Sequence, residues 1–115
     1  MTSTDRDALV ALHNATGGGR WWSKNNWNTT ALLSRWYGVR VNAQGRVEGL
    51  NLPNNNLKAE MPASLGQLSI LPELYNNRLT GRIPVELEGL TELKELSLFG
   101  NQLTGKRIII VVLAH

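Results

Sequence analysis

Two stretches of the chain carry the same spacing of leucines followed by an asparagine. Residues 47–57 and 93–103 read VEGLNLPNNNL and LKELSLFGNQL, and both fit L-x-x-L-x-L-x-x-N-x-L if valine is accepted at the first position. Residues 77–84 supply the second half of a third copy. Alternating leucines indicate a strand that buries one face. Because one copy cannot bury its apolar face alone, the pattern predicts coils that stack on one another.

The asparagines of the pattern are predicted to be structural. Each falls where the chain leaves the strand, so its amide can pair with backbone groups of the turn and of the next coil. The asparagines of this ladder are Asn55, Asn77 and Asn101. Equivalent first positions at residues 47, 71 and 93 lie 24 and then 22 residues apart. The second copy is therefore shortened, and we place the two missing residues within its strand.

The first 46 residues follow other patterns. Apolar residues at helical spacing predict a helix over residues 4–16, in which Thr4 and Asp7 resemble a capping box. We interpret His13, near the end of this helix, as a C-terminal cation or a surface residue. Residues 39–41 and 47–52 flank a turn and predict a hairpin that leads into the repeats.

Tryptophan is concentrated between the predicted helix and hairpin. The four residues are Trp21, Trp22, Trp27 and Trp36. They could form a platform for a sugar or a proline-rich peptide, or they could cover the open end of the stack, since terminal repeats need a cap. We favour the cap, and we expect Trp36 and at least two of the other three to be buried.

Several motifs together resemble plant-type leucine-rich repeat proteins, which include receptor-kinase ectodomains and polygalacturonase-inhibitor-like proteins. The motifs are W-x-G-V at residues 36–39, G-R-V-x-x-L-x-L at 45–52 and L-T-G-x-I-P at 79–84. The resemblance implies an α/β solenoid. Such a solenoid is a right-handed superhelix with short parallel strands on its concave face and an N-terminal helix and hairpin as its cap. Cysteines beside W-x-G-V form a disulfide in many such caps, but this chain has no cysteine.

The resemblance divides the chain into three regions. Residues 1–46 are the cap, residues 47–105 hold about three repeats, and residues 106–115 are an apolar tail that departs from the pattern. Residues 108–113 have the composition of an aggregation-prone strand, so we expect self-association through the C-terminal end.

Function is expected on the concave face, as a module that binds a protein or peptide. When the repeats are aligned on the ladder asparagines, the outward-facing residues at equivalent positions form columns across the coils. These columns combine aromatic rings and carboxylates, a composition suited to protein or peptide ligands. The expected site residues are Glu48, Asn51, Pro53, Glu73, Tyr75, Glu95, Ser97 and Phe99. The alternative is a secreted carbohydrate-binding or cell-wall-enzyme-inhibitor module that uses the tryptophans.

Composition argues against other classes of function. A basic cap followed by an acidic repeat region argues against a continuous nucleic-acid surface. The chain has two histidines and no cysteine, and we find no nucleophile–base set and no metal spacing, so we expect no enzyme, no cofactor and no metal. Residues 100–106 fit G-x-x-x-x-G-K, but Arg107 replaces the Ser or Thr that would bind magnesium.

The compartment is open at this stage. The first twenty residues are polar and unlike a signal peptide, and no apolar run approaches the length of a membrane span. Together with the lack of cysteine, these features favour the cytoplasm. If the chain is a fragment, an extracellular or membrane-receptor context is the alternative.

Overall fold

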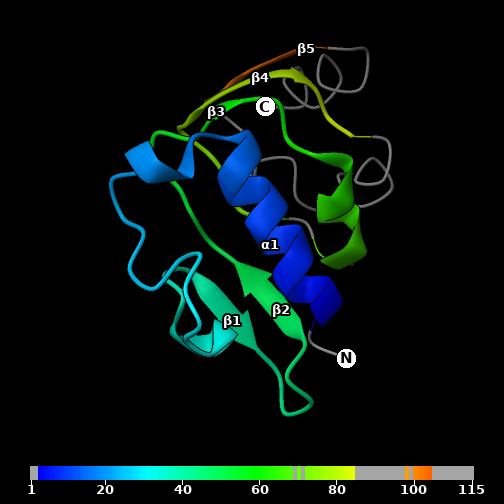
Figure 1. Cartoon of the computed structure of the whole chain (residues 1–115). Helices are drawn as coiled ribbons and strands as arrows, with labels where there is room; N and C mark the ends of the chain where they lie inside the picture. Colours follow the sequence, from blue (N-terminus) through cyan, green and yellow to red (C-terminus); the bar gives the residue numbers. More distant parts are fainter. Residues whose placement is uncertain (1–2, 69, 71, 85–97, 99, 105–115) are drawn as a thin grey trace.

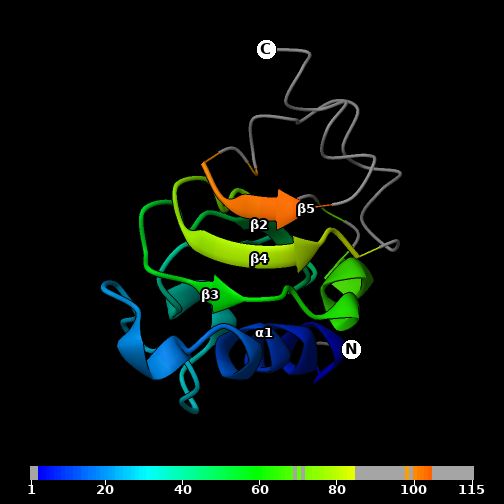
Figure 2. The same ribbon diagram turned by 90° about the horizontal axis from the view of Figure 1, so that it is seen from above.

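The computed structural model describes residues 3–68, 70, 72–84, 98 and 100–104. The predicted tail of residues 106–115 lies outside this part. The elements in chain order are α1 (Ser3–Ala15), η1 (Gly18–Arg20), η2 (Leu33–Arg35), β1 (Val39–Val41), β2 (Val47–Leu50), β3 (Lys58–Ala59), η3 (Ala63–Leu68), β4 (Arg78–Arg82) and β5 (Gln102–Thr104). Figure 1 and Figure 2 together show α1 along one side of the molecule next to β3, with β4 and β5 further away.

The predicted N-terminal helix is confirmed to within one residue at each end. Its apolar positions Ala8, Leu9 and Leu12 are fully buried, as helical spacing requires of one face. The capping box is wrong, because the helix already includes Ser3 and Thr4 therefore lies inside it. At the other end, the Thr16 hydroxyl donates to the Leu12 carbonyl (2.6 Å) and is buried there.

The predicted hairpin is also confirmed. Strands β1 and β2 pair antiparallel, with Val39 opposite Leu50. Gly38 of the W-x-G-V motif enters this hairpin with φ of 80°, a conformation that favours glycine. A Cβ at Gly38 would also collide with the carbonyl oxygen of Asn51, so this glycine lets the cap lie directly against the first repeat.

Short parallel strands were predicted before the ladder asparagines, but the three-stranded parallel sheet of the described residues lies after them. It has the order β3–β4–β5, with Lys58 opposite Arg78 and Thr80 opposite Gln102. Figure 2 shows these strands as successive rows beside α1. The Lys58 amide donates to the Thr16 carbonyl (3.1 Å), so the end of α1 borders the sheet. The run after each ladder asparagine is therefore paired from coil to coil.

The position of the shortening within the second repeat was predicted wrongly. Asn51 pairs with Glu73, and the Asn54 amide donates to the Tyr75 carbonyl (3.0 Å). The strand register thus continues unbroken to the asparagines, and the two missing residues come from the segment before Glu73. Pro72 explains the error. This proline is buried at an inward position of the strand, where the repeat pattern has leucine, so an alignment on leucines misplaced the strand.

The tryptophans form the core of the cap. Trp36, Trp21 and Trp27 are only 2%, 3% and 5% exposed, whereas Trp22 is 69% exposed, which confirms the expected burial. The Trp27 ring lies 4.7 Å from that of Trp21 and 5.0 Å from that of Trp36, between ring centroids. Each buried indole donates its N–H to a backbone carbonyl, so the cluster buries large apolar area without an unpaired donor.

His13 belongs to this cluster, and its interpretation as a surface residue is wrong. Its ring is half-buried, 5.2 Å from Trp21 and 6.2 Å from Trp27 between centroids, and nearly parallel to the latter. Gly18 makes room for it, because a Cβ there would overlap the imidazole. The core of the cap continues into the leucines of the repeats as one cluster.

Candidate functional site

The structure describes five of the eight predicted site residues, which we together call the strand face. Glu48 lies in β2, and the other four, Asn51, Pro53, Glu73 and Tyr75, flank the buried Leu52 and Leu74. Glu48, Asn51 and Glu73 are exposed, and Pro53 and Tyr75 are half-buried. The other three predicted residues, Glu95, Ser97 and Phe99, lie outside the described residues. The strand face thus combines two carboxylates, an amide, a proline and an aromatic ring.

Strand alternation creates this face. Leu52 and Leu74 are fully buried, and their neighbours along the chain therefore point outward. The Leu52 amide donates to the Glu73 carbonyl (2.9 Å), and the Glu73 amide donates to the Leu50 carbonyl (2.8 Å). These bonds fix Asn51 beside Glu73 as neighbours on adjacent coils.

Asn77 joins the two coils behind the strand face. Its Oδ1 accepts from the amides of Asn55 (2.8 Å) and Leu57 (3.0 Å). Its Nδ2 donates to the carbonyls of Leu52 and Leu74, both at 2.9 Å. One buried amide therefore satisfies four backbone groups, two donors and two acceptors, that water cannot reach easily.

Asn101 repeats this arrangement one coil further on. Its Oδ1 accepts from the Leu79 amide (2.9 Å), and its Nδ2 donates to the carbonyls of Leu74 (2.9 Å) and Leu98 (3.1 Å). Leu74 consequently accepts from the asparagines of both coils. The coils are held in register by side chains of the same type at equivalent positions.

Asn55 makes the corresponding contact with the cap. Its Oδ1 accepts from the Ser23 amide (2.6 Å), and its Nδ2 donates to the Ser23 carbonyl (2.7 Å). Ser23 precedes Asn55 by 32 residues and belongs to the tryptophan segment. The cap therefore presents to the first repeat the backbone groups that another coil would present.

An ion pair between a buried carboxylate and a partly exposed arginine ties α1 to the hairpin, and it was not predicted from the sequence. Asp5 is fully buried and accepts from Arg46 through both oxygens, at 2.8 and 3.0 Å, and from the Val47 amide at 2.9 Å. Burial alone would raise the pKa of Asp5, but these hydrogen bonds and the charge of Arg46 lower it below its usual value. Arg46 correspondingly has a raised pKa, chiefly through its hydrogen bond to Asp5.

A second ion pair of the hairpin is exposed and lies beside the strand face. Arg40 Nε lies 3.3 Å from Glu48 Oε2, and their side chains are 72% and 46% exposed. Solvent screens this pair strongly. Glu48 and Glu73 therefore both remain available to a ligand of the strand face.

The described residues offer neither a metal-binding cluster nor a membrane-spanning helix. No group of three or more His, Asp or Glu side chains there is arranged to hold a metal ion. No helix in the same part of the chain combines the length and apolar composition needed to cross a bilayer.

Comparison with curated proteins places the chain near plant receptor-like kinases. The chain is 29% identical over 104 residues to a probable leucine-rich repeat receptor-like serine/threonine-protein kinase of Arabidopsis thaliana, a match that covers 89% of this chain and 11% of that protein. It is 42% identical over 75 residues to the leucine-rich repeat receptor-like kinase RGI4 of the same plant, covering 63% and 7%. The chain thus spans about a tenth of the length of these relatives. No family model matches it.

Solved structures agree with this placement. The BIR2 ectodomain of Arabidopsis thaliana superposes with a TM-score of 0.66 at 25% identity, covering 86% of this chain and 56% of that one. A chain of the BIR3–SERK2 complex from the same plant gives 0.58 at 25%, covering 90% and 62%. A plant ice-binding protein shares the fold, with 0.60 at 22%, covering 89% and 32%. With its asparagine ladder and these similarities, the chain resembles plant-type leucine-rich repeat proteins, and the described residues form part of a leucine-rich repeat fold.

Proposed function

We propose that the chain is a recognition module that binds a protein or peptide through its strand face. The observation that supports this most directly is the register that sets exposed Asn51 beside exposed Glu73, with half-buried Pro53 and Tyr75 two residues further along each coil. In this proposal the coils continue as a right-handed superhelix, and the strand face is its concave side.

The chemistry of the strand face suits a polypeptide ligand. Tyr75 offers a ring that is partly fixed by packing, so it can bury apolar area at small entropic cost. Glu48 and Glu73 add two exposed carboxylates to this set of residues, which favours ligands that carry Arg or Lys. In the proposal, Glu95, Ser97 and Phe99 extend the same columns across the next coil.

The relatives support a binding role. Two of them are named as receptor-like kinases, and one similar structure is a complex of two proteins, BIR3 and SERK2. Because the matches cover only a small part of those kinases, we propose for this chain binding alone and no catalysis. The chemistry of the strand face then indicates that the partner is a protein or a peptide.

The carbohydrate-binding alternative has less support. It depended on the tryptophans as an exposed platform, but three of the four are at most 5% exposed and pack against one another. Trp22 alone keeps an exposed indole in this cluster. A single exposed ring is a poor basis for a sugar platform, so we do not retain this role.

A random peptide library displayed on phage tests the proposal without a known partner. Peptides selected on the wild-type chain would be measured for affinity against three variants: Tyr75→Ala, Glu73→Ala and Lys58→Ala. We expect Tyr75→Ala to weaken binding by about tenfold, the effect of an interface residue worth somewhat over 1 kcal/mol. Lys58 is exposed on β3, away from the strand face, and serves as the control. Peptides that lose affinity with Lys58→Ala and keep it with Tyr75→Ala would contradict the proposal.

A further inference from the structure

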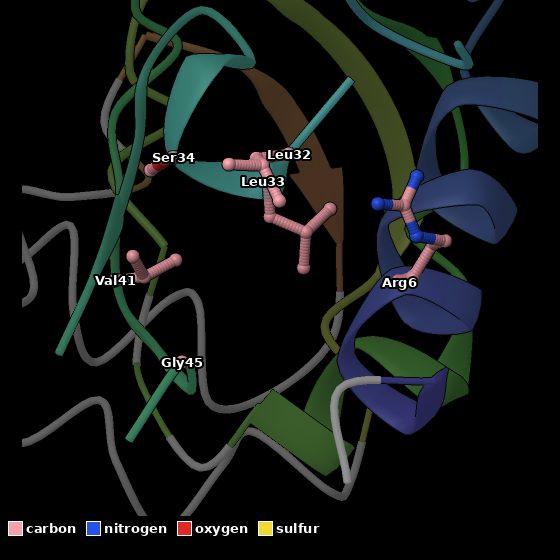
Figure 3. A pocket seen from close by; sticks show the side chains of 6 residues that line it. All are labelled: Arg6, Leu32, Leu33, Ser34, Val41 and Gly45. Carbon is pink, nitrogen blue, oxygen red and sulfur yellow. The ribbon is translucent and has the colours of Figure 1, made fainter. Parts of the chain in front are cut away.

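A cavity of about 250 Å³ lies in the cap, apart from the strand face. It opens between α1, η2 and the β1–β2 hairpin, and its lining is mostly apolar. The lining residues are Arg6, Leu32, Leu33, Ser34, Val41 and Gly45. Figure 3 shows Arg6 reaching from α1 on the side opposite Val41, with the two leucines between them. The volume lies just below the usual range of roughly 300–1,000 Å³ for ligand sites, so the cavity suits only a small molecule.

The apolar residues that line the cavity differ in how deeply they are buried. Leu33 is only 5% exposed and belongs to the core, whereas Leu32 is 70% exposed and stands at the rim. Val41 is half-buried against the same core. An exposed leucine beside a cavity leaves apolar area in water that a ligand with an apolar body would cover.

The guanidinium of Arg6 is held in place at this cavity. It donates to the carbonyls of Thr29 (3.0 Å) and Ala31 (3.1 Å), and its Cζ lies 5.2 Å from the ring centroid of Trp36. These contacts use two of its five N–H groups. Because the cation is already fixed, a ligand that binds it would lose little side-chain entropy.

The charge of Arg6 is not neutralised within the described part of the chain. The ion pairs found there join Arg40 to Glu48 and Arg46 to Asp5. Of the two carboxylates next to Arg6 in sequence, Asp5 is bonded to Arg46 and to the Val47 amide. Asp7 is exposed and forms no ion pair with a described residue. A fixed cation without a carboxylate partner beside an apolar cavity is complementary to an anion that carries an apolar body.

We propose that this cap cavity binds small amphipathic monocarboxylates, with the carboxylate on Arg6 and the hydrocarbon body against Leu33 and Val41. A cavity of about 250 Å³ corresponds to roughly eight molecules of liquid water at about 30 Å³ each. This is the scale of a short fatty acid with some ten non-hydrogen atoms, such as octanoate. The site is separate from the strand face, so neither proposal depends on the other.

Titration with octanoate, followed by backbone amide chemical shifts of the whole chain, tests the site. We expect saturable shifts at the lining residues 32–34, 41 and 45. Octanol, which has the same tail without the charge, should bind at least about tenfold more weakly, because charge-assisted hydrogen bonds to Arg6 are lost. Equal affinity for octanol and octanoate, or the lack of saturable shifts at these residues, would overturn the proposal.

Three variants separate the charge from the cavity. Arg6→Gln should remove the preference for octanoate over octanol, and Val41→Phe, which fills the cavity, should weaken both. Arg35→Gln removes an exposed arginine of η2 that does not line the cavity, and it should change neither. If Arg6→Gln unfolds the chain, Val41→Phe decides, since unchanged octanoate affinity in that variant contradicts the site.

A dilution series without ligand excludes a different occupant. Shifts at the lining amides that depend on protein concentration alone would show that a second copy of the chain fills the cavity through an exposed side chain. That result would overturn the small-molecule proposal. Shifts that are independent of protein concentration and appear only with octanoate support it.

Discussion

The cap and the repeats bury their apolar surface with different side chains. In the cap, Trp21, Trp27 and Trp36 pack ring against ring, and each indole N–H reaches a different backbone carbonyl. In the repeats, leucines recur at fixed positions, and asparagines of equivalent position satisfy the backbone. The packing and hydrogen bonding of the repeats recur from coil to coil, whereas those of the cap occur once, at the end of the stack.

The junction between the two regions explains why the cap is shaped as it is. The Asn55 side chain is hydrogen-bonded to the amide and the carbonyl of Ser23, where a preceding coil would provide the same groups. The Lys58 amide likewise donates to the Thr16 carbonyl. A cap that only covered apolar surface would leave these buried polar groups unpaired, at a cost of about 1–3 kcal/mol each. The cap therefore has to match the repeats in hydrogen bonding as well as in packing.

The largest expected effect is in the aromatic core of the cap. Trp36→Ala should lower the free energy of unfolding by about 3–5 kcal/mol, the usual range for a buried large aromatic side chain. Trp22→Ala is the matched control, because its indole is exposed and its loss should change stability by about 0.5 kcal/mol or less. Urea denaturation measures both, and equal midpoints for the two variants would contradict the proposed core.

The next effect is in the ladder. Asn77→Ala leaves the amides of Asn55 and Leu57 and the carbonyl of Leu52 without their side-chain partner, and we expect a loss of about 2–4 kcal/mol. The Leu74 carbonyl keeps its bond from Asn101. The strand face should be unaffected, since Asn77 is buried behind it. Thermal denaturation measures the loss. An unchanged melting temperature combined with lost peptide binding would instead assign Asn77 to the binding surface.

Features carried by local patterns could be predicted from the sequence. The N-terminal helix follows from helical spacing, the hairpin from two short apolar runs about a turn, and the tryptophan burial from the need to close the stack. The equivalent positions of Asn51 and Glu73 in adjacent coils were predicted from their equal spacing before the ladder asparagines. Each of these depends on residues near one another or on a repeated spacing.

Other features could not be predicted, for physical reasons. Helical spacing puts Asp5 on the same face as the buried Ala8, Leu9 and Leu12, unlike exposed Asp7. Its pairing with Arg46, however, spans 41 residues, and no local pattern identifies that partner. Strand β3 has two exposed residues, and β4 contains Gly81, so neither shows strand alternation. Their pairing is imposed by the stacking of coils, which is a property of the fold and not of either segment.

A smaller effect is expected at the Asp5–Arg46 pair. Asp5→Asn should cost about 1–2 kcal/mol at neutral pH, less than a fully buried pair because Arg46 is partly solvated. Since folding lowers the pKa of Asp5, its stabilisation is present above the unfolded value near 3.9 and is lost as pH falls through the lower folded pKa.

Denaturation as a function of pH checks the sign of this prediction. The wild type should lose its advantage over Asp5→Asn as the pH is lowered from about 4, until the carboxyl is protonated in both states. A constant difference between the two proteins down to the lowest pH would show that packing, and not charge, makes Asp5 important.

The smallest expected effect is at the other ion pair of the same hairpin. Arg40 and Glu48 lie 3.3 Å apart, but both side chains are largely in water, so attraction is screened and ordering the two side chains costs entropy. Arg40→Ala should change stability by about 0.5 kcal/mol or less, and added salt should leave the wild type nearly as stable. The comparison with Asp5→Asn is direct, because both pairs join an arginine of the hairpin to a carboxylate and differ in burial. If Arg40→Ala cost as much as Asp5→Asn, burial would not be what distinguishes them. Glu48 would then be held in place by Arg40, and its availability to a ligand of the strand face would have to be reconsidered.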